Sequence, residues 1–334
     1  MRAWQIPSFG LQALEFIERP TPVPAAGEVL VKIHAVSFNY RDLLLVKGLY
    51  NPRLKLPRIP CSDGAGVVEA VGEGVTQFKP GDRVAGIFMQ NWLEGPPTPA
   101  NVKGALGGDI DGMLAEYIVL RESGIVRIPE DMDLLHASTL PCAAVTAWNA
   151  LKVGNVRSGS TVLVQGTGGV SVFAMQMARL MGARVLGTST HAEKLEQALA
   201  LGLDAGLNTA ETPEWAPWVL DQTGGEGVDL VVEVGGERTL PQSLQAVRMG
   251  GAIAQIGVLS GVDCHLPVTA ILHKQVRLQG IYVGCRKDFE EMNAFLSHTR
   301  LEPIVESFPW TTSRQVLERM EAQGHFGKLA VTVD

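Results

Sequence analysis

A glycine-rich turn at the end of an apolar run has the spacing of a site for nucleotide phosphates. The stretch Thr161-Val-Leu-Val-Gln-Gly-Thr-Gly-Gly-Val-Ser171 predicts a buried strand that turns directly into a helix. Gly166 permits the tight turn, and Gly168 lets a pyrophosphate approach bare backbone. The amides of Gly169 and Val170 open the helix and present its positive end to that anion. The stretch therefore predicts a dinucleotide site.

The elements that position this turn predict a doubly wound α/β fold. The third small position of the turn is Ser171 rather than glycine, so the match is to a relaxed fingerprint and needs support from its context. After Pro129 helix and strand patterns alternate for more than a hundred residues, which is typical of a Rossmann parallel sheet. The six expected strands are Thr161–Gln165, Arg184–Thr188, Ala205–Asn208, Val228–Val234, Gly251–Gly257 and Arg277–Val283.

The rest of the chain predicts a second, β-rich domain. A chain of 334 residues exceeds the usual size of one core, and 46% hydrophobic and 19% charged residues suit a compact protein. Residues 27–36 alternate as a half-buried strand, and short strand patterns with glycine, proline and aspartate turns follow. A helix is expected around 40–48, helices around 289–299 and 313–322, and a strand at 329–333. The expected domains are 1–124, 125–284 for the nucleotide-binding domain, and 285–334, which returns to the first domain.

Charge and cysteine content exclude several classes of protein. The net charge is −7 without any basic run, which argues against nucleic acid or an anionic membrane as partner. No apolar run reaches the roughly 20 residues of a membrane span, and the first ten residues lack a leader pattern, so we expect a cytoplasmic protein. The four cysteines have no CxxC spacing, which indicates reduced, buried thiols.

The residues about 20 positions beyond the glycine turn bear on which nucleotide binds. An NAD site usually carries a carboxylate there, but this chain has Ser189, followed by Thr190 and His191, with Lys194 one helical turn on. The hydroxyls and the cation favour a 2′-phosphate, and hence NADP(H). The alternative is a polar helix start capped by Ser189 or Thr190, with Lys194 in solvent.

Several motifs in order resemble the medium-chain dehydrogenase/reductase superfamily. They are Val36-Ser-Phe-Asn-Tyr-Arg-Asp-Leu43, DGAGVVEAVGEGVTQFKPGDRV from Asp63, LPCAAVTAW from Leu140, the glycine turn, and VVEVGG from Val231. The resemblance covers nearly the whole chain. It implies a GroES-like catalytic domain made from both chain ends, a Rossmann domain enclosed by it, and an active site in the cleft between them.

The resemblance is to zinc-free members of that superfamily. Zinc members hold the metal with a cysteine and a histidine at the positions of Asn39 and Ser62, neither of which is a plausible zinc ligand. The cysteine-rich loop of a structural zinc is also missing. We therefore expect no metal.

Further cofactor contacts are implied only by the resemblance. For the glycines among them, turn geometry is an equally good explanation, and for the two basic residues an exposed salt bridge is the alternative. The implied contacts are Thr146, Gly235, Gly257, Val258, Arg286 and Lys328.

Without zinc, an oxygen that gains charge during hydride transfer needs hydrogen-bond donors and a source of a proton. Tyr50 matches the tyrosine of zinc-free reductases, and a phenol with a pKa of about 10 stays protonated at neutral pH. Asn39 supplies an amide donor, and Ser62, with Tyr40 and Asp63, is a second candidate. The alternative is that Tyr40 and Tyr50 are half-buried aromatic residues with satisfied hydroxyls.

The neighbours of these candidates have structural explanations. Arg41 and Asp42 are expected to form an ion pair or a helix cap, and Cys61 has no adjacent histidine that would make it a nucleophile. The long loop from Trp92 to Gly112 is either a packed lid over the pocket or a flexible surface insertion.

These features predict a zinc-independent, NADPH-dependent oxidoreductase that reduces a carbonyl, a quinone or an α,β-unsaturated carbonyl. The alternative is a non-catalytic NADPH-binding protein, like the crystallin relatives of this superfamily. The last strand of the sheet, 277–283, is expected at an open edge and so predicts a homodimer.

Overall fold

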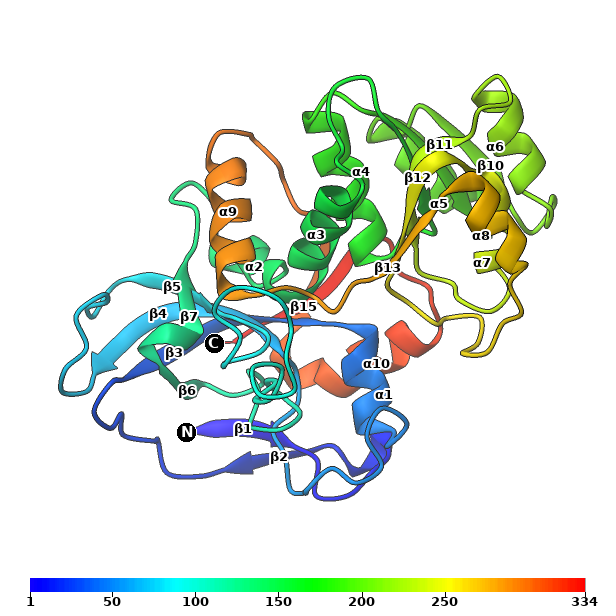
Figure 1. The fold of residues 1–334 in the computed structure, drawn as a ribbon. Coiled ribbons are helices and arrows are strands. Elements are labelled where there is room, and N and C mark those ends of the chain that lie inside the picture. The colour runs from blue at the N-terminus through cyan, green and yellow to red at the C-terminus, as the bar shows by residue number, and fades with distance from the viewer. Residues whose placement is uncertain (334) are drawn as a thin grey trace. The chain divides into compact units, whose positions relative to one another are not determined.

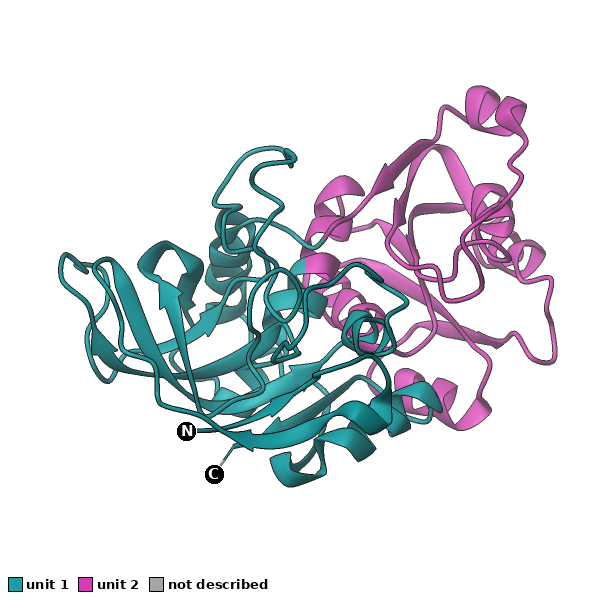
Figure 2. Cartoon of the chain, turned by 90° about the horizontal axis from the view of Figure 1, so that it is seen from below, with its two compact units in different colours: residues 1–145, 283–334 teal, residues 146–282 magenta. Residues whose placement is uncertain are grey.

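The computed structural model describes residues 1–333, which form two compact units (Figure 2). Unit 1 contains Met1–Val145 and the chain from Val283 onward, and unit 2 contains Thr146–Tyr282. The predicted domain boundary at residue 125 is wrong by about twenty residues. The reason is that strand β7 (Ile125–Arg127) pairs with β5 (Arg83–Gly86), and that the Cys142 amide donates to Asp63 in unit 1.

Unit 1 is built on a seven-stranded sheet. Its strand order is β14-β15-β3-β4-β5-β7, and β6 pairs with β3 outside this path. A separate antiparallel pair is formed by β1 (Arg2–Gln5) and β2 (Glu15–Glu18), which the sequence pattern did not predict. The remaining strands are β3 (Glu28–Phe38), β4 (Asp63–Val71), β6 (Tyr117–Arg121), β14 (Val305–Pro309) and β15 (Lys328–Thr332).

The C-terminal segment returns to this sheet, as predicted. Strand β15 pairs antiparallel with β3, so the red end of the chain lies beside its blue beginning (Figure 1). Strand β14 beside it was missed, because its residues are half exposed and end at a proline without apolar alternation. The helices of unit 1 are α1 (Tyr40–Val46), α2 (Leu134–Ala137), α9 (Arg286–Ser297) and α10 (Ser313–Glu321), with short 3₁₀ turns at Leu11–Ala13, Glu122–Gly124 and Trp310–Thr312 and a π turn at Leu140–Ala144.

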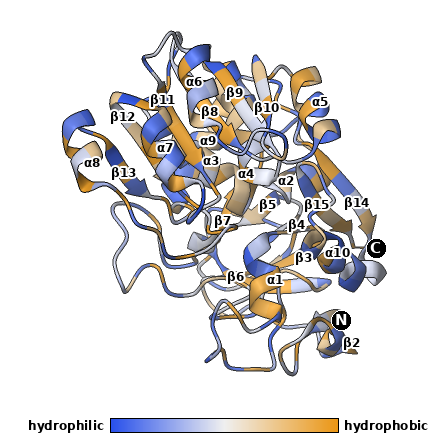
Figure 3. Ribbon diagram, turned by 90° about the vertical axis from the view of Figure 1, so that its right-hand side faces the viewer, coloured by the Kyte–Doolittle hydropathy of each residue, from blue (hydrophilic) through white to orange (hydrophobic). Residues whose placement is uncertain are grey.

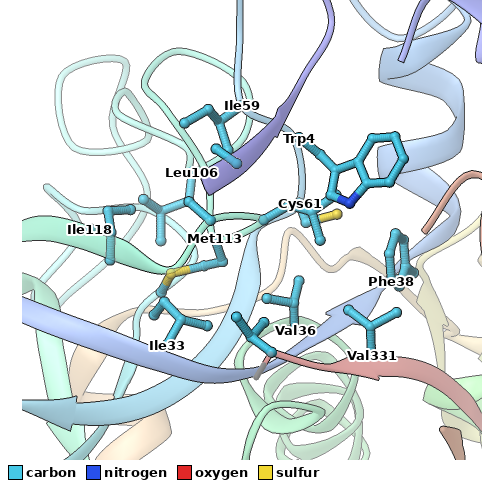
Figure 4. Packing of buried hydrophobic residues seen from close by; sticks show 14 of the residues in the cluster. Trp4, Ile33, Val36, Phe38, Ile59, Cys61, Leu106, Met113, Ile118 and Val331 are labelled. Carbon is cyan, nitrogen blue, oxygen red and sulfur yellow. The ribbon is translucent and has the colours of Figure 1, made fainter. Parts of the chain in front are cut away.

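The core of unit 1 joins residues from both chain ends. Figure 4 shows Trp4, Phe38, Cys61, Met113 and Val331 packed among other apolar side chains. Burial of this apolar surface by strands β3 and β15 holds the C-terminal segment to the N-terminal sheet.

Unit 2 is a six-stranded parallel sheet with the order β10-β9-β8-β11-β12-β13, as the sequence pattern predicts. The order reverses between β8 and β11, where open α/β sheets bind ligands at the carboxyl ends of the strands. The central strands are apolar and buried (Figure 3). The strands are β8 (Thr161–Gln165), β9 (Arg184–Ser189), β10 (Ala205–Asn208), β11 (Val228–Glu233), β12 (Val247–Gln255) and β13 (Arg277–Gly280).

Helices cover this sheet. The ends of β12 and β13 differ from the predicted ones by two to four residues, since glycines allow β12 to start earlier while the chain leaves β13 after Gly280. The helices are α3 (Val145–Val153), α4 (Gly169–Leu180), α5 (Ala192–Ala200), α6 (Ala216–Gln222), α7 (Leu240–Ala246) and α8 (Val268–Lys274). Among the described residues, none of the helices combines the length and the apolar character that a membrane span requires.

The loop that follows Phe88 is packed in part. The Trp92 side chain is buried and its indole N–H donates to the carbonyl of Gly95, whereas Leu93 is exposed. The carbonyls of Trp92 and Leu93 accept from the amides of Arg286 and Lys287 at the start of α9. A merely flexible insertion is therefore the wrong interpretation for this part of the loop.

Candidate functional site

The glycine turn after β8 leaves open space beside the backbone. Gly166 has a φ of 68°, which favours glycine, and a Cβ atom built on Gly166 or Gly168 would meet no atom within 4 Å. Gly168 is the N-cap of α4. Because glycine has no side chain, it accepts no hydrogen bond from the first amides of the helix through a side chain. Backbone N–H groups beside open space suit an anion such as a pyrophosphate.

Ser171 explains why this turn tolerates a relaxed fingerprint. Its buried hydroxyl donates to the carbonyl of Gln165 at 2.6 Å, which ties the first turn of α4 to the end of β8. The small side chain thus permits close packing of helix and strand, and adds a hydrogen bond that glycine cannot make.

A buried carboxylate at the end of β11 holds the neighbouring loop. Glu233 Oε1 accepts from the amides of Gly235 and Gly236 at 2.8 and 3.0 Å and from the Thr239 hydroxyl at 2.6 Å. Glu233 is fully buried, so these donors replace the water it has lost. The sequence interpretation missed Glu233, although a glutamate inside the apolar run before Gly235 was a signal for a specific buried role.

The other implied cofactor residues of unit 2 lie at strand or helix ends. Thr146 is buried at the start of α3, and Gly257 follows β12, with Val258 beside it half exposed. A Cβ atom on Gly257 would lie 2.2 Å from the carbonyl oxygen of Val234, so close approach of two strand ends requires glycine there. Turn geometry therefore accounts for this glycine, as the alternative interpretation held.

The segment that we expect to contact the ribose is a short turn rather than a helix cap. Ser189 ends β9, is buried, and its Oγ accepts from the amide of His191 at 3.1 Å. Helix α5 begins at Ala192 with His191 as N-cap, so the alternative of a cap at Ser189 or Thr190 is wrong by one or two residues. Thr190 is exposed, and its hydroxyl lies 2.9 Å from His191 Nδ1. Lys194 lies in the first turn of α5.

Unit 1 gathers a cluster of buried polar groups, which we call the polar cluster: Asn39, Ser62, Asp63 and Lys328. The Lys328 ammonium donates to Asn39 Oδ1 at 2.6 Å and to the Phe38 carbonyl at 2.7 Å. Asn39 Nδ2 lies 3.4 Å from Ser62 Oγ, and Ser62 donates to Asp63 Oδ1 at 2.6 Å. Two predicted candidates, Asn39 and Ser62, thus lie together.

The carboxyl of Asp63 is the acidic end of this cluster. Its Oδ2 accepts from the amide of Cys142 at 3.0 Å and lies 4.0 Å from the Lys328 ammonium. Burial raises the pKa of Asp63 to about 6, although the Lys328 ammonium and the Ser62 hydroxyl favour its charged form. Desolvation therefore outweighs a single cation at this distance.

Tyr50 is exposed and follows α1 rather than lying within the polar cluster. The centroid of its ring lies 5.4 Å from the guanidinium carbon of Arg41, a distance suited to a cation–π contact. Arg41 also pairs with Asp42 at 3.2 Å, and Asp42 Oδ2 accepts from the amide of Asn39 at 2.9 Å. The expected ion pair and helix cap for Arg41 and Asp42 are confirmed.

The two basic residues implied to reach phosphates have other partners. Arg286 pairs with Glu290 at 2.8 Å and donates to Gln77 Oε1 at 3.1 Å, so the salt-bridge alternative holds for it. For Lys328 the alternative of an exposed salt bridge is wrong, because its side chain is only 3% exposed. The pairing of β15 with β3 brings Lys328 beside the end of β3, which no local pattern could reveal.

The residues at the polar cluster do not fit a zinc site. Neither the Asn39 amide nor the Ser62 hydroxyl is a usual zinc ligand, and both carboxyl oxygens of Asp63 already accept hydrogen bonds. Within residues 1–333, no three His, Cys, Asp or Glu side chains gather as a metal site would require. The buried thiols of Cys61 and Cys142 have raised pKa values because burial disfavours the thiolate.

Two family models match this chain. Residues 25–130 match the alcohol dehydrogenase GroES-like domain, and residues 169–298 match the zinc-binding dehydrogenase domain. The first match falls on unit 1, and the second covers most of unit 2 and continues through α9 of unit 1.

Individual relatives are similar over most of their length. A zinc-type alcohol dehydrogenase-like protein of Schizosaccharomyces pombe is 43% identical over 92% of this chain and 91% of its own. An acryloyl-coenzyme A reductase of Metallosphaera sedula is 30% identical over 88% of both chains. A solved NAD-dependent alcohol dehydrogenase is 32% identical with a TM-score of 0.90 over 100% of both chains.

Proposed function

Because the chain belongs to the medium-chain dehydrogenase/reductase superfamily, we propose that it is a zinc-independent, NADPH-dependent oxidoreductase of carbonyls, quinones or α,β-unsaturated carbonyls. The observation that carries the proposal is the polar cluster. An amide, a hydroxyl and an ammonium group meet there, where zinc members of the family have metal ligands. Hydrogen-bond donors of this kind can stabilise an oxygen that gains negative charge.

The residues of unit 2 would hold the nicotinamide nucleotide, which supplies the hydride when bound. The open backbone at Gly166 and Gly168 and the first amides of α4 suit the pyrophosphate. The Glu233-bound loop at Gly235 and the strand end at Gly257 lie at the ends of parallel strands, where such ligands bind. Arg286 and Lys328 leave the proposed set, because their donors have partners in unit 1.

We assign the substrate-facing roles to Asn39 and Tyr50. Asn39 offers an amide N–H, and Tyr50, whose side chain is exposed, offers a hydroxyl proton. Ser62 is fully buried and donates to Asp63, so its role is to connect Asn39 to that carboxyl. A half-buried structural tyrosine remains the alternative for Tyr50, and an unchanged rate in Tyr50→Phe would favour it.

The preference for NADPH rests on Ser189, Thr190 and Lys194, which put no carboxylate at the ribose position. The related solved NAD-dependent alcohol dehydrogenase supports the opposite choice. Michaelis constants for NADPH and NADH with the same substrate decide between them, and a clear preference for NADH would refute this assignment.

Turnover separates this proposal from a non-catalytic role. The purified protein should oxidise NADPH with at least one member of a carbonyl, quinone and enone panel, and should do so without added metal. Tight NADPH binding with no turnover of any panel member would favour the NADPH-binding protein instead. Stoichiometric zinc in the active protein, lost together with activity on chelation, would overturn zinc independence.

We also propose a homodimer through β13. Among the described residues this edge strand pairs only with β12, and all four of its residues are exposed. Leu278 on β13 and Leu272 on α8 add exposed apolar surface in unit 2. A dimeric mass in solution that becomes monomeric in Leu278→Glu would support this assembly, and a monomeric wild-type mass would refute it.

A further inference from the structure

Lys328 is a buried cation whose donors point at a candidate catalytic residue. Its ammonium is 2.6 Å from Asn39 Oδ1 and 2.7 Å from the carbonyl oxygen of Phe38, and its side chain is 3% exposed. Desolvating an ammonium is unfavourable unless its hydrogen bonds are replaced. This burial therefore calls for an explanation in the contacts that Lys328 makes.

The contact with Lys328 determines which way the side-chain amide of Asn39 is turned. The oxygen and nitrogen of a side-chain amide are assigned from their hydrogen bonds. An ammonium donates three hydrogen bonds and accepts none, so the atom of Asn39 that faces Lys328 must be the carbonyl oxygen. The amide nitrogen then faces the other way, toward Ser62 Oγ at 3.4 Å.

The hydrogen bonds run in one direction from this cation. Lys328 donates to Asn39, Asn39 Nδ2 lies toward Ser62, and Ser62 donates to Asp63 at 2.6 Å. Because Ser62 donates its single hydroxyl proton to Asp63, its oxygen can only accept a hydrogen bond from Asn39. Asp63 lies 4.0 Å from Lys328, which closes the cluster as a ring between one cation and one carboxyl.

The backbone of Asn39 is fixed separately. Its amide donates to Asp42 Oδ2 at 2.9 Å, and the preceding residue Phe38 pairs with Leu329 in the antiparallel pairing of β3 and β15, so neither contact needs the Lys328 ammonium. The main chain can therefore stay in place when the side-chain contact is removed, and only the carboxamide becomes free to turn.

We propose that Lys328 is a positioning residue, which fixes the Asn39 carboxamide so that its N–H donor, and not its carbonyl, is available to the substrate oxygen. This inference rests on the proposed function of Asn39 as a donor. A turned carboxamide would present a lone pair to an oxygen that gains negative charge, and would raise the barrier instead of lowering it.

The test compares Lys328→Met with a matched control, Lys274→Met. Lys274 in unit 2 also donates to three backbone carbonyls, those of Leu244, Gln245 and Val247, but touches no candidate site residue. Both variants should lose stability. Only Lys328→Met should lower kcat, by about 10- to 100-fold, with KM changed much less.

A double-mutant cycle with Asn39→Ala shows whether Lys328 acts through Asn39. In the Asn39→Ala background, Lys328→Met should lower kcat by less than about twofold, because there is no carboxamide left to orient. Lys328→Arg keeps a donor-only cation and should recover part of the rate. Full additivity of the two substitutions would overturn the proposal and would indicate a direct contact of Lys328 with substrate.

Nucleotide binding and NMR supply readouts that do not depend on turnover. The Kd for NADPH should be the same in wild type and Lys328→Met, and a loss of affinity would mean that Lys328 binds the cofactor. The ¹⁵N side-chain amide signal of Asn39, identified by its loss in Asn39→Ala, should shift or split in Lys328→Met but not in Lys274→Met. If wild type shows no turnover, the proposed function fails, and an unchanged amide signal would still refute the positioning role.

Discussion

Gln165 and Glu233 join the two strands between which the parallel sheet reverses its order. Gln165 Nε2 donates to Glu233 Oε2 at 2.8 Å, and both side chains are buried. The backbone carbonyl of Gln165 also accepts a hydrogen bond from the Ser171 hydroxyl, and Glu233 accepts one from the Gly235 amide. The Gln165–Glu233 pair therefore links the glycine turn to the loop at Gly235. The two halves of the proposed nucleotide site therefore depend on each other.

Glu233→Gln should weaken nucleotide binding more than its small change in shape suggests. Whichever oxygen is replaced, the new NH2 group would face donors: the amides of Gly235 and Gly236 on one side, or Gln165 Nε2 on the other. We expect the free energy of unfolding to fall by about 1–3 kcal/mol. We also expect the Kd for NADPH, measured by fluorescence titration, to rise by about tenfold or more as the loop loosens.

Asp229→Asn is the control for this variant. Asp229 lies at the other end of β11, where it accepts from the amide of Thr161 and pairs with Arg248, both at 2.7 Å. Its substitution should lower stability and leave the Kd unchanged. Equal losses of affinity in the two variants would show that strand stability, and not the loop, controls binding.

Ser189→Asp should shift the nucleotide preference from NADPH toward NADH. An aspartate can accept the same hydrogen bond from the His191 amide that Ser189 accepts, so the turn is expected to survive. The added carboxylate would repel a 2′-phosphate and raise the Kd for NADPH by about tenfold or more, with the Kd for NADH unchanged or lower. Ser189→Ala removes the hydroxyl without adding charge, and an equal effect in that variant would refute the charge argument.

The protein should be more stable with glycine at position 61 than with alanine there. The φ of Cys61 is 70°, in the left-handed region, while its side chain is buried in the core of unit 1 (Figure 4). Alanine keeps the backbone strain and glycine removes it, so Cys61→Gly should be about 1 kcal/mol more stable than Cys61→Ala in urea unfolding.

Cys142 provides the matched comparison, because it lies in a helical turn and is not among the residues with positive φ. There the usual order should hold, with Cys142→Ala more stable than Cys142→Gly. The same order at both positions would mean that the strain at Cys61 is not significant.

Asp63 should make stability depend on pH in a defined window. The unfolded carboxyl has a pKa of 3.8, and burial raises the pKa of the folded one to about 6. Between these values the folded chain holds a proton that the unfolded chain has released, so stability falls as pH rises from 4 to 6 and then levels off. The decline is at most about 3 kcal/mol, from 1.36 kcal/mol for each pKa unit.

Asp63→Asn isolates this contribution from that of the other carboxyls. The difference in unfolding free energy between the variant and wild type should change in favour of the variant from pH 4 to pH 6, and stay constant from pH 6.5 to pH 8. Unfolding in urea across this pH series measures it. A constant difference across the whole range would show that Asp63 titrates normally.

Much of the fold could be predicted from the sequence because its signals are local. The apolar run before Gly166 and the alternation of helix and strand after Pro129 predict the six-stranded sheet, since periodicity is set by residues that are neighbours in the chain. The boundary at 125 failed for the opposite reason. Strand β7 is placed by pairing with β5, some forty residues earlier, and not by any feature of its own three residues.

The candidate residues Asn39 and Ser62 were predicted by the family pattern, because their positions are those of the zinc ligands in zinc members. What Lys328 does was decided by the tertiary structure alone. It is 289 residues from Asn39 in the chain, and only the pairing of β15 with β3 brings its ammonium to the Asn39 oxygen. The same is true of Gln165 and Glu233, which are 68 residues apart and meet because β8 and β11 are adjacent strands. Residue types and local spacing determine which groups are present and on which elements, but the partner of a buried polar group is chosen by long-range packing.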